Sequence, residues 1–327
     1  MACLLLLLIC SLTAVGFANG QVSSDEPQTS IRPLRRGGKS IPADRPDTVL
    51  RVASALVLIP VHVTTVAGTS VVGLKKDDFE LYEDGVAQPV ASFFTQDAPI
   101  SIGLLLDTSA SMKNKMEKAS QAAEIFFHTA NPEDEFFLVE FSGRAKLAVP
   151  FTPDANEVYQ RIAHTKPFGQ TPLFDAIHLA LKEMKSARNS RKALVILSDG
   201  GDNWSRYSAR AIRSALLESD VQVYAMGIFD PDYMHNHPAE ERRGPLLLDD
   251  LAAQTGGRHF PVADLEELPA ISARIGEELR HEYVLGYYPQ NQPEDGKYHG
   301  IKVKVQAPNG TAEMRTYYRH GYFAPGP

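Results

Sequence analysis

An oxygen-rich loop follows an apolar stretch in the first half of the chain. Residues 101–106 are apolar or small, and residues 107–111 are Asp-Thr-Ser-Ala-Ser. Alternation along this loop directs the side chains of Asp107, Ser109 and Ser111 toward one point. One carboxylate and two hydroxyls suit a hard divalent cation such as Mg²⁺, which prefers oxygen ligands and tolerates an incomplete protein shell. The segment therefore predicts a buried strand that ends in part of a metal site.

Two later segments add side chains of the same kind. Thr171 lies in a Gly-Gln-Thr-Pro loop directly ahead of a predicted helix, and Asp199 ends a second apolar run. In a doubly wound sheet, ligands gather beyond the carboxyl ends of the strands, so we expect these residues at one rim. The alternative is a local role, because Asp107 and Ser109 also suit the N-cap of a helix.

The three segments together resemble the von Willebrand factor type A (VWA) family. The metal-ion-dependent adhesion site of that family is written Asp-x-Ser-x-Ser, followed by a distant Thr and a distant Asp. The matching residues in this chain are Asp107, Ser109, Ser111, Thr171 and Asp199. The resemblance implies that Mg²⁺ or Mn²⁺ is held by the serine hydroxyls and by the threonine or an aspartate, some of them through water. It also implies an open coordination position that an acidic side chain of a protein partner completes.

The flanking segments resemble a group of secreted bacterial VWA proteins that is often seen in acidobacteria. This second resemblance rests on residues 72–85, before the VWA region, and residues 282–289, after it. It implies an exported protein, and with the metal-dependent site it leads us to expect a role in adhesion or envelope scaffolding.

The elements expected around the site form a doubly wound α/β domain over residues 98–265. Buried apolar runs alternate with stretches of helical spacing, which is typical of a mostly parallel sheet with helices on both faces. We expect strands over residues 102–106, 136–141, 193–197 and 221–228, and helices over residues 113–130, 157–164, 173–187, 208–219 and 246–255.

The segments on either side of this domain alternate apolar and polar residues, which predicts antiparallel strands. Residues 48–97 contain two such stretches, with a tight turn at Asp84 and Gly85, and residues 280–327 continue the pattern. Because a two-stranded hairpin is marginal alone, we expect the two segments to pair into one smaller β domain. We interpret residues 266–279, which have helical spacing, as a connector helix.

The N-terminus has the features of an export signal. Residues 1–20 contain a short apolar run followed by small residues, with cleavage expected after Gly20 and Ala18 at the minus-three position. A retained membrane anchor is the alternative interpretation. Residues 21–47 are polar and predict a disordered linker. The mature chain is therefore expected without a transmembrane helix, secreted or in the periplasm or cell envelope.

Composition limits the possible functions. Of the 327 residues, 43% are hydrophobic and 22% charged, which allows a sizeable core divided over two modest domains. A net charge of −7 argues against general affinity for nucleic acid or anionic membranes. Both cysteines, Cys3 and Cys10, lie in the expected signal segment. The mature protein therefore has no cysteine nucleophile and no thiolate zinc site.

Several further residues have two interpretations. Asp175 suits the start of a helix. Asp202 suits a turn, and the alternative is that it supports the metal ligands from behind. Trp204, the only tryptophan, is either a core residue or a contact residue beside the metal. His235 and His237 resemble a zinc-chelating pair, but their Pro- and charge-rich surroundings indicate a solvated loop instead.

The competing function is a metal-dependent enzyme. An apolar strand that ends in aspartate also opens phosphohydrolase sites of the haloacid-dehalogenase type. Those sites need a second acid two residues later, where this chain has Ser109. The sequence contains no nucleophile elbow, Walker loop or dinucleotide-binding glycine pattern. A third possibility, an intracellular partner of an AAA+ motor, conflicts with the expected export signal. We therefore predict a binding module with no catalytic residue.

Overall fold

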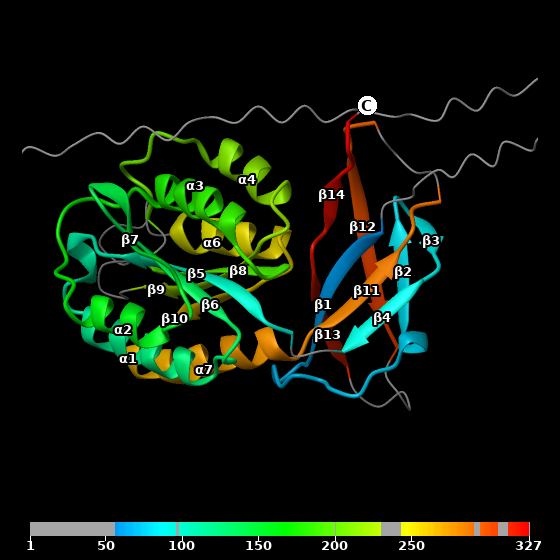
Figure 1. Cartoon of the computed structure of the whole chain (residues 1–327), viewed down its shortest axis with the longest axis horizontal. Helices are drawn as coiled ribbons and strands as arrows, with labels where there is room; N and C mark the ends of the chain where they lie inside the picture. Colours follow the sequence, from blue (N-terminus) through cyan, green and yellow to red (C-terminus); the bar gives the residue numbers. More distant parts are fainter. Residues whose placement is uncertain are drawn as a thin grey trace, which may run out of the picture. The chain divides into compact units, whose positions relative to one another are not determined.

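The computed structural model describes residues 56–95, 98–199, 201–229, 243–290, 295–306 and 313–326. The expected signal segment, the linker and the histidine pair at His235 and His237 lie outside these residues. Figure 1 shows the described elements as a helix-covered sheet and a separate group of strands. None of the helices among the described residues is both long enough and apolar enough to cross a membrane.

Six strands form the central sheet of the α/β domain: β5 (Ile100–Asp107), β6 (Glu135–Ser142), β7 (Arg144–Thr152), β8 (Arg191–Ser198), β9 (Gln222–Ile228) and β10 (His259–Val262). Their order is β10-β9-β8-β5-β6-β7. All neighbours run parallel except β6 and β7. Every residue of β5, β6 and β9 is buried, as expected for strands covered on both faces. The predicted doubly wound, mostly parallel α/β fold is therefore confirmed.

Helices cover both faces of this sheet (Figure 1). Residues of β5 divide between the two hydrophobic cores, with Leu104 and Leu106 in one and Leu105 in the other. This division follows because successive side chains of a strand point to opposite faces. The first core is covered by α1 (Met116–His128), α2 (Ala155–Ala163) and α7 (Leu268–Arg280), and the second by α3 (Leu173–Glu183), α4 (Ala209–Leu217) and α6 (Arg243–Gln254).

Helix α7 is more than the connector that its position in the sequence suggested. Leu268, Ile275 and Leu279 are fully buried in the first core of the α/β domain. The Ser272 hydroxyl donates a 2.5 Å hydrogen bond to the carbonyl of Ala122, in α1. These contacts make α7 an integral helix of the α/β domain.

Strand β7 was absent from the sequence-based expectations. It is an edge strand with only two of its nine residues buried, and its pairing with β6 shifts register on both sides of Leu138. Irregular pairing of this kind interrupts the alternation of apolar and polar residues. Gly143, with φ +62°, provides the sharp reversal between β6 and β7.

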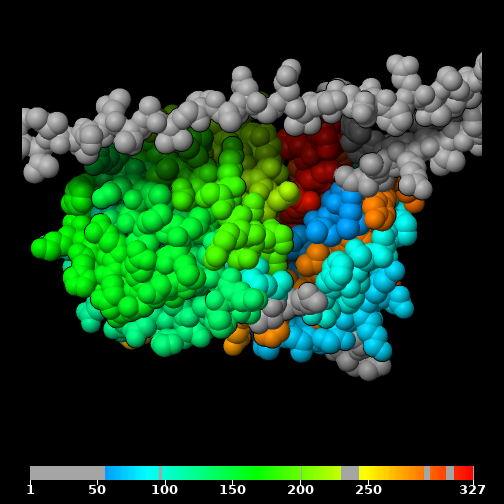
Figure 2. Space-filling view, in the orientation of Figure 1, coloured from blue at the N-terminus to red at the C-terminus, as the bar shows by residue number. Residues whose placement is uncertain are grey.

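The remaining strands form two antiparallel sheets, in the orders β13-β1-β11-β4 and β14-β12-β2-β3. Strand β1 pairs with β11 and β13, and β2 pairs with β12. Segments from both sides of the α/β domain therefore share both sheets, and Figure 2 shows early and late segments together on this part of the surface. These strands are β1 (Val57–Thr65), β2 (Phe79–Glu83), β3 (Val86–Gln88), β4 (Ser92–Thr95), β11 (Tyr283–Tyr287), β12 (Tyr298–Val305), β13 (Met314–Tyr318) and β14 (Gly321–Phe323).

The β part has its own hydrophobic core between its two sheets. Ile59, Leu285 and Val303 are buried in one cluster, to which strands from both flanking segments contribute. The tight turn expected between β2 and β3 is present, with φ of +48° at Asp84 and +81° at Gly85. Positive φ at both central residues is the geometry that joins two antiparallel strands by a two-residue loop.

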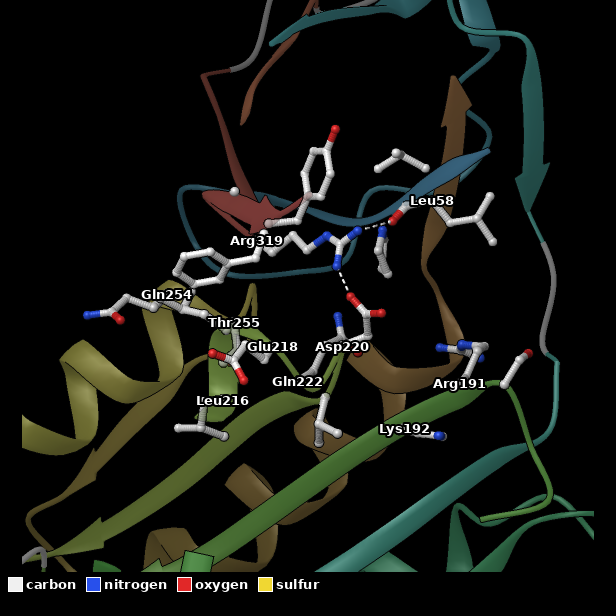
Figure 3. A pocket seen from close by; sticks show the side chains of 18 of the residues that line it. Leu58, Arg191, Lys192, Leu216, Glu218, Asp220, Gln222, Gln254, Thr255 and Arg319 are labelled. Carbon is white, nitrogen blue, oxygen red and sulfur yellow. Dashed lines mark hydrogen bonds and ion pairs between the residues drawn. The ribbon is translucent and has the colours of Figure 1, made fainter. Parts of the chain in front are cut away.

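Charged side chains connect the two parts of the molecule around a cavity of about 500 Å³ (Figure 3). Arg191, on β8, donates to Oε2 of Glu282 at 2.7 Å, and this pair is almost fully buried. Arg319 forms an ion pair with Asp220 and donates to the carbonyl of Leu58 at 3.1 Å. The Arg191–Glu282 pair is buried and Asp220 is exposed, and both contacts join the α/β domain to segments of the β part.

Candidate metal centre

The carboxyl ends of β5 and β8 meet at one edge of the sheet. The two strands are parallel neighbours, with Leu106 opposite Leu197. This register brings the next residues, Asp107 and Ser198, side by side, and the Ser198 hydroxyl donates a 2.6 Å hydrogen bond to Oδ2 of Asp107. Asp199 follows directly, so the strand pairing brings both aspartates to the same rim.

Asp107 lies beneath the rim. Its side chain is fully buried, and its Oδ1 accepts a 2.8 Å hydrogen bond from the backbone N–H of Ser109. Burial, with repulsion from Asp199 as the second cause, raises the pKa of Asp107 from 3.8 to about 7. A buried carboxylate that is repelled by a second carboxylate favours a cation near the two groups.

The two serines of the loop lie together. The hydroxyl oxygens of Ser109 and Ser111 are 2.9 Å apart. Ser109 is buried and Ser111 exposed, so the pair extends from the buried carboxylate of Asp107 toward solvent. A 3₁₀ turn over Ala110–Met112 gives the loop this compact shape.

A second loop brings Thr171 to the serines. The N–H of Ala110 donates to the carbonyl of Gly169 at 3.1 Å, which ties the two loops together. The Thr171 N–H donates to Oδ1 of Asn203 at 2.9 Å, and the Asn203 N–H donates back to the Thr171 carbonyl at 3.2 Å. Thr171 is thereby held with only 4% of its surface exposed. Sequence reasoning missed Asn203, because nothing in the local pattern connects it with a loop more than thirty residues away.

Four of the five predicted site residues line one pocket of about 770 Å³, and the fifth, Asp107, lies below it. Leu246 and Leu247, near the start of α6, also line the pocket. Asp202 also lines it, but its Oδ1 accepts a 2.5 Å hydrogen bond from Ser205. The residues from the predicted set that line the pocket are Ser109, Ser111, Thr171 and Asp199.

The donor atoms of this pocket fit a hard divalent cation. Within the described ranges, no cluster of three or more His, Cys, Asp or Glu side chains has a metal-binding arrangement. A cation at this rim would therefore depend on the serine and threonine hydroxyls together with the aspartates. An all-oxygen set with few carboxylates suits Mg²⁺ or Mn²⁺ and disfavours the softer zinc ion.

A lysine that the sequence did not point to also lies at the rim. The ammonium of Lys115 is 3.9 Å from Oδ2 of Asp199 and donates a 3.2 Å hydrogen bond to the carbonyl of Ile228. Both side chains of the ion pair are only 11% exposed. The sequence predicted a helix over residues 113–130, which includes Lys115, so this lysine was not recognised as a rim residue. In the structure α1 begins at Met116, and Lys115 lies just before the helix. Lys115 is thus an internal counter-charge for one of the candidate metal ligands.

Comparison with known protein families identifies a segment of the α/β domain. Residues 102–201 match the profile of the family described as von Willebrand factor type A domain. The α/β domain of this chain is a VWA domain.

Among solved structures, the chain is similar to the conserved hypothetical protein BatB from Bacteroides thetaiotaomicron, with 19% identity, a TM-score of 0.44 and coverage of 55% of this chain and 98% of that chain. A von Willebrand factor type A protein from Catenulispora acidiphila gives 12% identity, a TM-score of 0.49, and coverage of 74% and 73%. The vWF domain of the type V pili tip protein Mfa5 from Porphyromonas gingivalis gives 12% identity, a TM-score of 0.45, and coverage of 56% and 95%.

Proposed function

We propose that this chain is an exported protein that binds a protein partner through a divalent cation held at the rim of its VWA domain. The observation that carries the proposal is that hydroxyls of Ser109, Ser111 and Thr171 line one pocket directly above the buried carboxylate of Asp107. These residues come from loops about sixty residues apart in the sequence. A purely local capping role for each of them gives no reason for such convergence.

Each residue has a distinct part in this function. The three hydroxyls and Asp199 offer oxygen atoms to the pocket, while Asp107 fixes the loop through the Ser109 N–H and supplies negative charge from below. A bound Mg²⁺ or Mn²⁺ supplies a hard Lewis-acidic position that a carboxylate from outside the protein can complete. The pocket opens to solvent, which leaves room for that carboxylate. The partner is therefore expected to present an acidic side chain.

The geometry favours binding over phosphohydrolase chemistry. A nucleophilic aspartate needs a free oxygen in contact with the substrate. Both oxygens of Asp107 accept hydrogen bonds, from Ser198 and Ser109, and its side chain lies outside the pocket lining. We therefore assign no catalytic residue. Export rests on residues 1–20, and the site of action we propose is the cell envelope or the extracellular space.

The test is metal titration of variants that keep the fold. Thr171→Val removes one hydroxyl at nearly constant volume, and Ser111→Ala removes another that is exposed. Each is expected to weaken Mg²⁺ or Mn²⁺ binding at least tenfold in calorimetry, which corresponds to about 1.4 kcal/mol. Ser186→Ala, at an exposed serine remote from the rim, is the matched control and keeps wild-type affinity. Unchanged affinity in Thr171→Val and Ser111→Ala would refute the proposed site.

A further inference from the structure

Large apolar side chains are exposed around the candidate metal pocket. Phe168 is 63% exposed and Trp204 57%, and each directly adjoins a residue that lines the pocket. Leu246, which lines the same pocket, is 70% exposed. Exposed apolar groups gathered around a polar centre are typical of a surface that contacts another protein. Aromatic residues in such positions are also enriched among those that dominate binding energy.

The backbone at both aromatic residues is held by contacts that also shape the metal site. The Phe168 N–H donates a 2.8 Å hydrogen bond to the carbonyl of Thr108, next to Ser109. Trp204 follows Asn203, which exchanges two hydrogen bonds with Thr171. Rigid presentation reduces the entropy lost when a partner packs on these side chains. The metal ligands and the aromatic surface thus form one preformed unit.

A bound cation would make the pocket complementary to an anionic partner. Arg213 and Arg243 line the pocket together with Asp199 and Asp202, so these four side chains have no excess of positive charge. Arg213 pairs with Asp250, whereas Arg243 is exposed and forms no ion pair with any residue that the structure describes. A divalent cation at the rim therefore supplies the excess positive charge, and Arg243 lies near it as a second cationic group. An acidic group is therefore complementary to the centre of the surface, and an apolar group is complementary to its border.

We propose that the partner is a protein segment in which the acidic side chain is flanked by aromatic or large aliphatic side chains that pack on Phe168 and Trp204. This inference rests on the proposed metal-dependent function and adds the chemistry of the residues next to the acid. A small carboxylate or a highly polar acidic segment fills the metal position but leaves both aromatic side chains in water. Such ligands therefore bind more weakly than a segment with apolar flanks, because they bury less apolar surface.

The experiment uses three capped pentapeptides: Gly-Phe-Asp-Leu-Gly, the same peptide with serine at both flanking positions, and the same peptide with asparagine at the acidic position. Binding to the full chain with Mg²⁺ is measured by calorimetry, and Trp204, the only tryptophan, provides an independent fluorescence signal. We expect the apolar-flanked acidic peptide to bind at least about tenfold more tightly than the serine-flanked one. The asparagine peptide is expected to lose binding.

Variants distinguish a failure of the aromatic surface from a failure of the proposed metal-dependent function. Phe168→Ala with Trp204→Ala is expected to remove the preference for apolar flanks while leaving Mg²⁺ affinity unchanged. Phe94→Ala, at a residue that is 46% exposed on β4 of the β part, is the control and keeps the preference. If the wild-type chain binds no Mg²⁺, the proposed function itself fails. If Mg²⁺ binds but the flanking residues or the double variant make no difference to peptide binding, only the aromatic surface is refuted.

Discussion

Replacing Asp107 by asparagine should make the metal-free protein more stable at alkaline pH. The ionised carboxylate is fully buried beside Asp199, which raises its pKa from 3.8 to about 7. A raised pKa in the folded state means that the proton is held more tightly there. The contribution of the Asp107 carboxyl to the free energy of unfolding is therefore greatest below pH 3.8, where it is protonated, and is lost as the pH rises to about 7. Since one pKa unit corresponds to about 1.4 kcal/mol, the full loss is roughly 4 kcal/mol.

Asparagine removes the charge and keeps the hydrogen bonds. Its Oδ1 accepts from the Ser109 N–H as the carboxylate does, and its amide N–H donates to the Ser198 hydroxyl, which is also able to accept. At pH 8 with chelator, we expect the free energy of unfolding of Asp107→Asn to exceed that of wild type by up to about 4 kcal/mol. At pH 4 the two proteins should agree within about 1 kcal/mol, because the wild-type carboxyl is then largely protonated in the folded state.

Urea unfolding at both pH values, with chelator and with excess Mg²⁺, measures these differences. Mg²⁺ at about 100 times its Kd adds about 2.7 kcal/mol to wild type by mass action, and we expect no such gain in Asp107→Asn. The exposed Asp77→Asn is the control and should stay within about 0.5 kcal/mol of wild type throughout. If Asp107→Asn is no more stable than wild type at pH 8 in chelator, the reasoning from burial and repulsion is wrong.

Two further changes test charges that the fold brings together. Lys115→Met removes the ammonium that lies 3.9 Å from Asp199, so calorimetry should record Mg²⁺ affinity raised at least about tenfold. A lower affinity would show that Lys115 orders the rim instead of competing with the metal. Glu282→Gln removes the buried negative charge opposite Arg191 and should cost about 3–5 kcal/mol in urea unfolding. Lys118→Met, at an ion pair whose acid is exposed, should cost less than about 1 kcal/mol, and equal losses in the two variants would contradict this assignment.

The local sequence contains the information for the central strands and for which side chains follow them. Strands expected over residues 102–106 and 193–197 correspond to β5 and β8, because a run of apolar residues at these lengths is stable only when covered on both faces. Asp107 and Asp199 come directly after such runs, and parallel strands deliver their carboxyl ends to one edge. The position of both aspartates at one rim was therefore predictable from the sequence.

Only the tertiary structure determines how deeply these residues are buried and which other residues contact them. The depth of Asp107, the clamp of Asn203 on Thr171 and the approach of Lys115 to Asp199 all depend on strand register and on contacts between distant loops. Periodicity reports which face of an element is apolar, but it contains no information about which distant loop meets another. For the same reason α7 had the pattern of an amphipathic helix in the sequence, and only packing against α1 made it part of the α/β core.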